Sequence, residues 1–452
     1  MSFSLDPIFK DNLTGALGQQ VLDRYMQALE KEPATVSVRR NPIKLSQEAF
    51  AGHFAGLSDG QVPWCRDGIY LRERPQFHLD PLVHAGAFYV QDAASMVLQD
   101  LFASLRGDSA VRVLDLCAAP GGKSTCIASQ ALSAEDILVS NEVIRSRSAI
   151  LAENMAKWGR SNIVVTNDES RRFASLEGYF DIVLADVPCS GEGMFRKDAG
   201  SIGQWSPDNV ALCSARQRKI VAEAWPSLKT GGILIYSTCT FNRAENDGNV
   251  EWICRELGAE AMSLEVAPDA LRTDFGLQFI PGSTRSEGLY LAALRKTSAA
   301  RPTRLRLPKL PSKANCDYAR DCECYRVSTA GGDMIKAYPC GLAAEIMALE
   351  SSLGSIRSGV AVASVKGRDL VPTAAIALSE CLCEKTFPCE NLSAGDALKY
   401  LRLEPLVLTD APRGFILLKY EGIPLGFVKN LGSRTNNLFP SAWRLRSTEV
   451  IE

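Results

Sequence analysis

The stretch Val113-Leu-Asp-Leu-Cys-Ala-Ala-Pro-Gly-Gly-Lys-Ser-Thr125 decides how the middle of this chain folds. A β-branched apolar run ends at Leu116, small residues form a turn, and a helix is predicted to open near Lys123. Such a turn lets the backbone approach a ligand closely and presents free N–H groups at the start of the helix. The stretch therefore predicts a ligand-binding loop between a strand and a helix.

The glycines of this loop do not form a nucleoside triphosphate site. A P-loop reads Gly-x-x-x-x-Gly-Lys-[Ser/Thr], and its first glycine would stand where this chain has Cys117, while Pro120 removes a backbone N–H that phosphate needs. The alternative is a nucleoside cofactor with a methionine moiety across the loop. Glu142, at the end of the second strand, is then expected to accept both ribose hydroxyls. Asp168 or Glu169, near the end of the third strand, would accept from an adenine amino group.

Short apolar runs alternate with helical patterns around this loop, as is typical of an open parallel sheet covered on both faces. The expected strands are Val111–Leu116, Ile137–Val139, Ile163–Val165, Phe180–Ala185 and Gly232–Tyr236, with Leu289–Leu294 as an antiparallel neighbour. The expected helices are Ser124–Leu132, Arg145–Trp158, Val210–Leu228 and Ala244–Leu257.

The 452 residues are expected to divide into five segments. Residues 1–85 form a small α/β lobe, 86–295 the sheet domain, 296–315 a linker, 316–389 an intermediate region, and 390–452 a compact β-rich module with strand-like pieces at Leu406–Leu408, Gly414–Tyr420 and Leu425–Val428. No acidic residue lies between Glu287 and Asp317, whereas seven Lys and Arg do, so the linker is basic. A solubilising connector and a phosphate-binding segment beside the expected site explain these charges equally well.

Composition excludes several classes of protein. Fifty Lys plus Arg against 52 Asp plus Glu leave a net charge of −2, so a polyanion partner must be met by local patches. The three His residues all lie before residue 85, so a His-based site later in the chain is excluded. No apolar run approaches the roughly 18 residues that span a bilayer, so no membrane partner is expected.

The 14 cysteines point to a reducing cytoplasm rather than secretion, because they are scattered along a long chain without a signal-peptide pattern. None are spaced Cys-x-x-Cys. We interpret the two later groups as small buried thiols rather than metal ligands, and we expect no metal; these groups are Cys316, Cys322, Cys324 and Cys381, Cys383, Cys389.

Two other cysteines follow neighbouring strands. The fourth strand leads into Asp186-Val-Pro-Cys-Ser-Gly-Glu-Gly-Met194, and the fifth into Tyr236-Ser-Thr-Cys-Thr240. Residues just past the carboxyl ends of adjacent parallel strands converge on one crevice. Cys189 and Cys239 are therefore expected to face each other, with Asp186 between them.

Four motifs resemble the Nop/Sun family of RNA cytosine-5 methyltransferases, and the resemblance covers residues 1–295: Asp115-Leu-Cys-Ala-Ala-Pro-Gly-Gly-Lys123, Asp186-Val-Pro-Cys-Ser-Gly191, Ser237-Thr-Cys-Thr240 and Gln91-Asp-Ala-Ala-Ser-Met96. Residues 426–440 resemble the tail of RsmF-type bacterial members, which modify small-subunit ribosomal RNA. The resemblance implies a Rossmann-like class I methyltransferase sheet with an N-terminal α/β lobe and a C-terminal β-rich, PUA-like RNA-binding module.

The resemblance also implies residue roles. Cys239 is the nucleophile, because RNA enzymes of the family hold it in the Thr-Cys dipeptide, whereas DNA enzymes use the Pro-Cys dipeptide, here Pro188-Cys189. Cys189 assists release of the covalent product, and Asp186 contacts the target base. S-adenosylmethionine is held by Cys117, Ala118, Ala119, Pro120, Gly121, Gly122, Lys123, Glu142, Asp186 and either Asp168 or Glu169.

The expected reaction is methylation of carbon 5 of a cytosine in 16S ribosomal RNA. A thiolate added to carbon 6 makes carbon 5 nucleophilic, and a carboxyl group near ring N3 stabilises the charge that develops. Transfer RNA as substrate, or a non-catalytic ribosome-assembly factor, remain alternatives. RNA contacts are expected from Lys429 and Arg434 in a basic, aromatic tail, while Lys197 forms either an RNA contact or a surface salt bridge. A monomer is expected.

Overall fold

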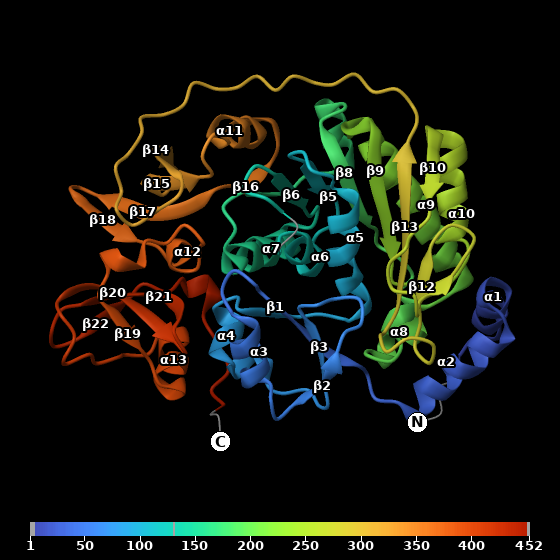
Figure 1. Ribbon diagram of the computed structural model, residues 1–452, viewed down its shortest axis with the longest axis horizontal. Helices are drawn as coiled ribbons and strands as arrows, with labels where there is room; N and C mark the ends of the chain where they lie inside the picture. The colour runs from blue at the N-terminus through green and yellow to red at the C-terminus, as the bar shows by residue number, and fades with distance from the viewer. Residues whose placement is uncertain (1–4, 130–131, 450–452) are drawn as a thin grey trace.

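The computed structural model describes residues 5–129 and 132–449 and arranges them in four β-sheets (Figure 1). Outside these ranges lie the ends of the expected segments 1–85 and 390–452, and positions 130–131 of the expected helix Ser124–Leu132. Within them, no helix has the length and hydropathy needed to cross a bilayer.

The largest sheet has the strand order β11-β12-β13-β9-β8-β5-β6-β7-β16, with β10 paired to β13. Strands β5 to β9 are parallel neighbours and β13 runs antiparallel to β9, so the expected mixed α/β sheet is confirmed. The strands are β5 (Arg112–Asp115), β6 (Ile137–Asn141), β7 (Ile163–Thr166), β8 (Phe180–Asp186), β9 (Leu228–Thr238), β10 (Ala259–Met262), β11 (Leu271–Arg272), β12 (Leu277–Phe279), β13 (Leu289–Lys296) and β16 (Ser355–Arg357).

Helices cover both faces of this sheet, because the parallel strands are apolar on both sides. One face carries α5 (Leu98–Leu105), α6 (Gly122–Ile127) and α7 (Arg145–Trp158), so α6 is shorter than expected and α7 matches its expected bounds. The other carries α9 (Pro207–Ala224) and α10 (Asp247–Trp252). Helix α8 (Ala199–Gln204) lies off this face, below the strands in Figure 1.

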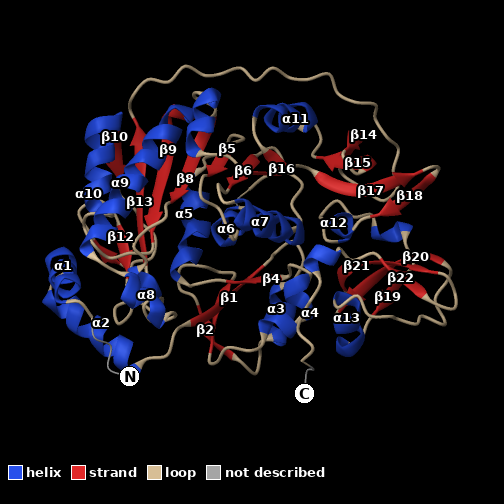
Figure 2. Ribbon diagram, turned by 180° about the vertical axis from the view of Figure 1, so that it is seen from behind, coloured by secondary structure: helices blue, strands red, loops and turns tan. Residues whose placement is uncertain are grey.

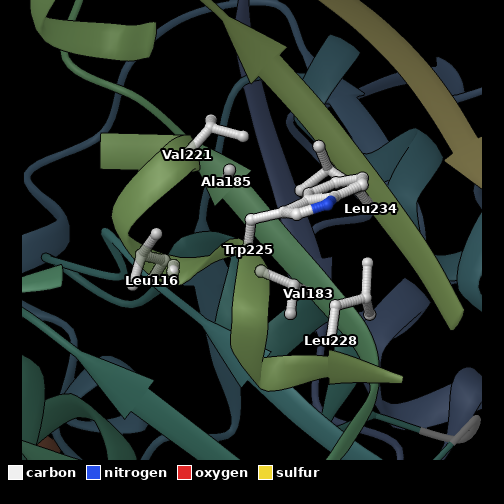
Figure 3. A pocket seen from close by; sticks show the side chains of 8 residues that line it. Leu116, Val183, Ala185, Val221, Trp225, Leu228 and Leu234 are labelled. Atoms are coloured by element: carbon white, nitrogen blue, oxygen red, sulfur yellow. The ribbon is translucent and has the colours of Figure 1, made fainter. Parts of the chain in front are cut away.

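The layer between α9 and the sheet is closely packed. Val221 and Trp225 lie over Val183, Ala185 and Leu234 of β8 and β9 (Figure 3). The void they leave is about 10 Å³, whereas ligand pockets start at roughly 300 Å³. A cofactor therefore does not bind in this layer.

The N-terminal lobe differs from expectation in two ways. Its sheet, in the order β2-β3-β1-β4, extends past residue 85, because β4 pairs with β1. Its first two helices do not pack on the sheet of this lobe. Their apolar faces pack against Phe195, Trp205 and Phe241 of the sheet domain. The elements are α1 (Pro7–Leu17), α2 (Gln19–Lys31), β1 (Val36–Arg40), α3 (Gln47–His53), β2 (Ser58–Gln61), β3 (Gly68–Leu71), α4 (Pro81–His84) and β4 (Phe88–Val90).

The basic linker crosses the amino edge of the parallel strands, so its expected place beside the site is wrong (Figures 1 and 2). Because β13 is antiparallel, it ends beside the start of β9, where Lys296 Nζ donates to Leu228 O at 2.9 Å. Thr303 N then donates to Glu177 O, just before β8, at 2.7 Å. The carboxyl ends of β8 and β9 lie at the opposite edge.

The intermediate region forms a sheet in the order β14-β15-β17-β18 and also contributes β16 to the large sheet, antiparallel to β7. Its elements are β14 (Glu323–Thr329), β15 (Gly332–Tyr338), α11 (Ala343–Ser352), β17 (Val360–Lys366), β18 (Asp369–Pro372) and α12 (Ala374–Ala377). The six later cysteines are free thiols, but only Cys381 is buried, so the prediction of buried thiols is wrong for the other five, of which Cys389 is exposed. The described ranges hold no group of three His, Cys, Asp or Glu suited to a metal ion.

The fourth sheet has the order β19-β20-β21-β22 and packs with α13. The prediction of a strand at Leu406–Leu408 is wrong. These residues form a loop, and Leu406 packs into the core of the module. The first strand begins at Cys389, before the expected boundary. The elements are β19 (Cys389–Asn391), α13 (Ala394–Leu401), β20 (Gly414–Tyr420), β21 (Ile423–Asn430) and β22 (Thr435–Asn437).

Candidate active site

Two cysteine sulfurs touch at the carboxyl edge of the large sheet. Cys189 lies shortly after β8, Cys239 directly follows β9, and their Sγ atoms are 2.9 Å apart. Because β8 and β9 are parallel neighbours, they deliver both loops to one place. The Cys239 amide also donates to Cys189 Sγ at 3.3 Å. The structure thus brings together the two cysteines that the sequence singled out.

The contact between the sulfurs changes the acidity of the Cys189 thiol. The hydrogen bond to Cys239, followed by burial, raises the pKa of the Cys189 thiol well above its ordinary value. The raised pKa keeps Cys189 in the thiol form, which is the poorer nucleophile. Of the two touching sulfurs, Cys189 is therefore the less suited to attack a base.

Asp186 ends β8 and ties this site to the Gly-rich loop. Its Oδ2 accepts from Lys123 Nζ at 2.8 Å, and its Oδ1 accepts from the Ser237 hydroxyl at 2.8 Å. Burial opposes the charge on Lys123, but the carboxylate outweighs it and raises the pKa of the ammonium group. A fixed cation and a fixed carboxylate therefore stand beside the two sulfurs.

The Gly-rich loop is held by side chains of α7. Arg147 donates to the Ala119 carbonyl at 2.8 Å, and Asn154 to the Pro120 carbonyl at 2.7 Å. Gly121 has a φ of +117°, a conformation that a side chain would strain. The loop that joins β5 to the first turn of α6 is thereby fixed; its other members are Cys117, Ala118 and Gly122.

Glu142 follows β6 beside this loop. Its Oε1 accepts from Ile144 N at 2.8 Å, and its Oε2 is 3.5 Å from Arg147. The next two side chains are apolar yet exposed, Val143 by 56% and Ile144 by 49%. Nearby, Asp115 Oδ1 is buried with no hydrogen-bond partner among the described residues. Carboxylate acceptors beside an uncovered apolar surface fit the ribose, base and amino groups of an adenosyl-methionine ligand.

The two candidates for the adenine contact differ in position. Asp168 Oδ2 accepts from the Gly354 amide, just before β16, at 2.7 Å. Glu169 is exposed and pairs with Arg171 at 2.6 Å. Both border a surface hollow of about 490 Å³. The fixed position of Asp168 favours it over Glu169.

The expected RNA contacts are spread over two surfaces. Lys197 Nζ is 3.9 Å from Asp92 Oδ1 and remains partly exposed. Lys429 of β21 lies 5.3 Å from the Phe415 ring, and Arg434 is exposed in the turn before β22. Both ribbon views separate this small sheet from β9, so the structure does not bring Lys429 and Arg434 to the cysteine pair.

Three residues of the site escaped sequence reasoning. Glu192 and Glu245 are buried carboxylates in the two cysteine loops, and Arg39 of the N-terminal lobe is fully buried against α6. Charged side chains are normally solvated, so their type gave no signal. The one available hint was the position of Glu192 between two glycines, three residues after Cys189.

Profiles of three protein families match the chain. Residues 5–93 match the N-terminal domain of 16S rRNA methyltransferase RsmF, residues 103–295 match 16S rRNA methyltransferase RsmB/F, and residues 389–445 match the methyltransferase RsmF PUA domain. The three matches fall on the N-terminal lobe, the large sheet and the fourth sheet.

Individual proteins give the same result. The chain is 33% identical to ribosomal RNA small subunit methyltransferase F of Klebsiella pneumoniae, over 92% of each chain. It is 32% identical to the protein of that name from Cronobacter sakazakii, over 93% of this chain and 92% of the relative. Among solved structures, a methyltransferase homologue from Pyrococcus horikoshii superposes with a TM-score of 0.55 and 25% identity, covering 64% of this chain and 95% of that one.

Proposed function

The chain belongs to the family of ribosomal RNA small subunit methyltransferases F, and on this premise we propose that it methylates carbon 5 of a cytosine in 16S ribosomal RNA with S-adenosylmethionine as donor. The observation that carries the chemistry is the contact between Cys189 and Cys239 beside the Asp186–Lys123 ion pair. Carbon 5 of cytosine is too electron-poor to take a methyl group unaided, and a thiolate at carbon 6 removes this obstacle.

The donor would lie along the Gly-rich loop. Glu142 would accept the ribose hydroxyls, Asp168 the adenine amino group, and Asp115 the amino group of the methionine part. When bound, the donor supplies an electrophilic methyl group. The ion pair between Lys123 of α6 and Asp186 of β8 joins this pocket to the cysteine loops, so it fixes the direction from which the target base approaches.

The covalent step uses Cys239. Its sulfur bonds to carbon 6, and the electron pair of the 5,6 double bond becomes available at carbon 5 for the methyl group. Asp186 contacts the base near ring N3, and the Lys123 ammonium paired with it offsets the negative charge that develops there. A general base then takes the proton from carbon 5, the electron pair of that C–H bond restores the 5,6 double bond, and the carbon 6–sulfur bond breaks with its electron pair leaving on Cys239 Sγ. Cys189 lies 2.9 Å from the departing sulfur and assists this release.

The remaining parts of the chain would hold RNA. The target base must leave its stack to reach Cys239, so the surrounding RNA has to be gripped elsewhere. We assign this to Lys197 beside the site, to Lys429 and Arg434 on the fourth sheet, and to the N-terminal lobe, with a monomer acting on one RNA. The 14 free thiols favour the cytoplasm.

Tritium transfer from labelled S-adenosylmethionine tests the proposal. Purified protein is incubated with naked 16S RNA, assembled small subunits or bulk transfer RNA, and the product is digested to nucleosides. We expect labelled 5-methylcytidine from 16S RNA in one or both of the first two samples. Label confined to transfer RNA, or RNA binding without label, would contradict it.

A further inference from the structure

Each cysteine loop holds the other through a buried carboxylate. Glu192 belongs to the Cys189 loop (residues 187–194), and its Oε2 accepts from the backbone amides of Phe241 and Asn242 at 2.6 and 3.1 Å. Both amides belong to the Cys239 loop (residues 239–246). The Gly193 amide also donates to the carbonyl of Cys239 at 2.8 Å. The Cys189 loop is therefore hydrogen-bonded to the backbone of the Cys239 loop on both sides of Thr240.

The Cys239 loop in turn binds the backbone of the Cys189 loop. Glu245 of the Cys239 loop accepts at Oε2 from the amide of Ser190, the residue after Cys189, at 3.0 Å. Gln217 of α9 donates to the same oxygen at 2.6 Å. Each carboxylate thus binds backbone within three residues of the cysteine that the other loop carries.

Asn242 joins the two carboxylates. Its Nδ2 donates to Glu192 Oε1 at 2.9 Å and to Glu245 Oε1 at 2.8 Å, and Trp205 Nε1 donates to Glu192 Oε1 at 2.8 Å. All these donors are neutral amides or an indole. Burial accordingly raises the pKa of Glu245. Removing two carboxylates from water costs free energy, which the hydrogen bonds from these neutral donors must offset. The positions of the carboxylates therefore depend on every donor.

We propose that Glu192 and Glu245 form a reciprocal latch and act as positioning residues that keep the two sulfurs in contact. This rests on the proposed function, because the covalent cycle needs Cys189 beside Cys239 when the product is released. The carboxylates do not touch the Gly-rich loop. Their role is therefore separable from cofactor binding.

The test measures how fast Cys189 and Cys239 form a disulfide with diamide, which takes two electrons and two protons from the pair. It needs neither RNA nor methyl donor. Glu192→Gln places an NH₂ against two donors whichever way the amide turns, so we expect cross-linking about tenfold slower than in wild type. Glu245→Gln can turn its NH₂ towards Asn242 alone, so we expect about threefold.

The matched control is Asp136→Asn. Asp136 is equally buried and accepts from Val111 N at 2.8 Å and Ser133 N at 2.6 Å, and also from Arg106 Nη2 at 3.0 Å, but it lies before β6, at the amino edge of the sheet. We expect this variant to cross-link at the wild-type rate. All three variants should bind S-adenosylhomocysteine within about twofold of wild type, while kcat on 16S RNA falls in the order of the cross-linking rates.

Several results would overturn the latch. One is disulfide formation in Glu192→Gln at the wild-type rate. Another is a rate in Asp136→Asn as slow as in Glu192→Gln, since that would mean that loss of any buried carboxylate loosens the whole domain. If Glu192→Gln does not fold, Gly193→Ala replaces it, because the added Cβ would stand 2.8 Å from the Cys239 carbonyl oxygen; unchanged cross-linking there would also refute the latch. If the variants cross-link at the expected graded rates but the wild-type protein methylates no RNA, the failure lies in the proposed function and not in the latch.

Discussion

Arg39 connects the N-terminal lobe to the first turn of α6, and its replacement should weaken both the fold and cofactor binding. The side chain is 0% exposed. Its guanidinium donates to Thr125 Oγ1 at 2.6 Å, Ser129 Oγ at 2.7 Å and Gln91 Oε1 at 2.8 Å, with two longer bonds of 3.3 Å to carbonyls of the same helix. It also lies 4.8 Å from the Trp158 ring.

The magnitude of the loss follows from these contacts. A hydrogen bond from a charged group contributes about 1.5–3 kcal/mol net. In Arg39→Met, Thr125 and Ser129 keep other partners, whereas Gln91 Oε1 loses its donor. The free energy of unfolding should therefore fall by about 3–5 kcal/mol, in the range found when a buried charged network is broken. Arg39→Lys keeps one strong bond, and we expect about half that loss.

Two assays check this prediction. Urea unfolding followed by tryptophan fluorescence gives the stability change, and calorimetric titration with S-adenosylhomocysteine gives the affinity. Because α6 opens at the Gly-rich loop, we expect affinity in Arg39→Met to fall about tenfold, which corresponds to about 1.4 kcal/mol. The exposed Arg72→Met is the control and should change stability by less than about 0.5 kcal/mol. An Arg39→Met protein as stable as this control, or one destabilised with wild-type affinity, would refute the reasoning.

Two further predictions concern the cofactor pocket. Burial raises the pKa of Asp115 to about 7, so the folded protein binds a proton that the unfolded chain has lost, and stability falls as the pH rises from about 4 through 7. Between pH 4 and 9, urea unfolding should show Asp115→Asn gaining about 4 kcal/mol relative to wild type, and a constant difference would contradict this. A Cβ in Gly354→Ala would stand 3.0 Å from Asp168 Oδ1, so affinity for S-adenosylhomocysteine should fall about fivefold while Gly395→Ala, which has open space, binds normally. Equal affinities in the two variants would remove Asp168 from the adenine site.

The central sheet was predictable because its strands are short β-branched runs between turn residues, and because parallel order determines which ends meet. The same rule placed Cys189 beside Cys239. It could not place β16, since Ser355-Ile-Arg357 has neither length nor alternation, and its pairing with β7 depends on contacts distant in sequence.

The linker position was missed for a related reason. Its charge is visible in the sequence, but which edge of the sheet it crosses follows from the direction of β13. Glu192 and Glu245 were missed because burial of a carboxylate depends on donors from other loops, and residue type alone predicts a solvated group. The position of the linker and the burial of these two carboxylates depend on tertiary contacts, which the local sequence pattern does not encode.

Trapping of the RNA–protein adduct tests the proposed chemistry most directly. Cys189→Ala and Cys239→Ala proteins are incubated with labelled 16S RNA and S-adenosylmethionine, then run on denaturing gels. Cys189→Ala retains the attacking sulfur but lacks the group that assists release, so it should accumulate a covalent adduct. Cys239→Ala should form no adduct and transfer no methyl group. An adduct in Cys239→Ala, or methylation at the wild-type rate by that protein, would contradict the assignment of the nucleophile.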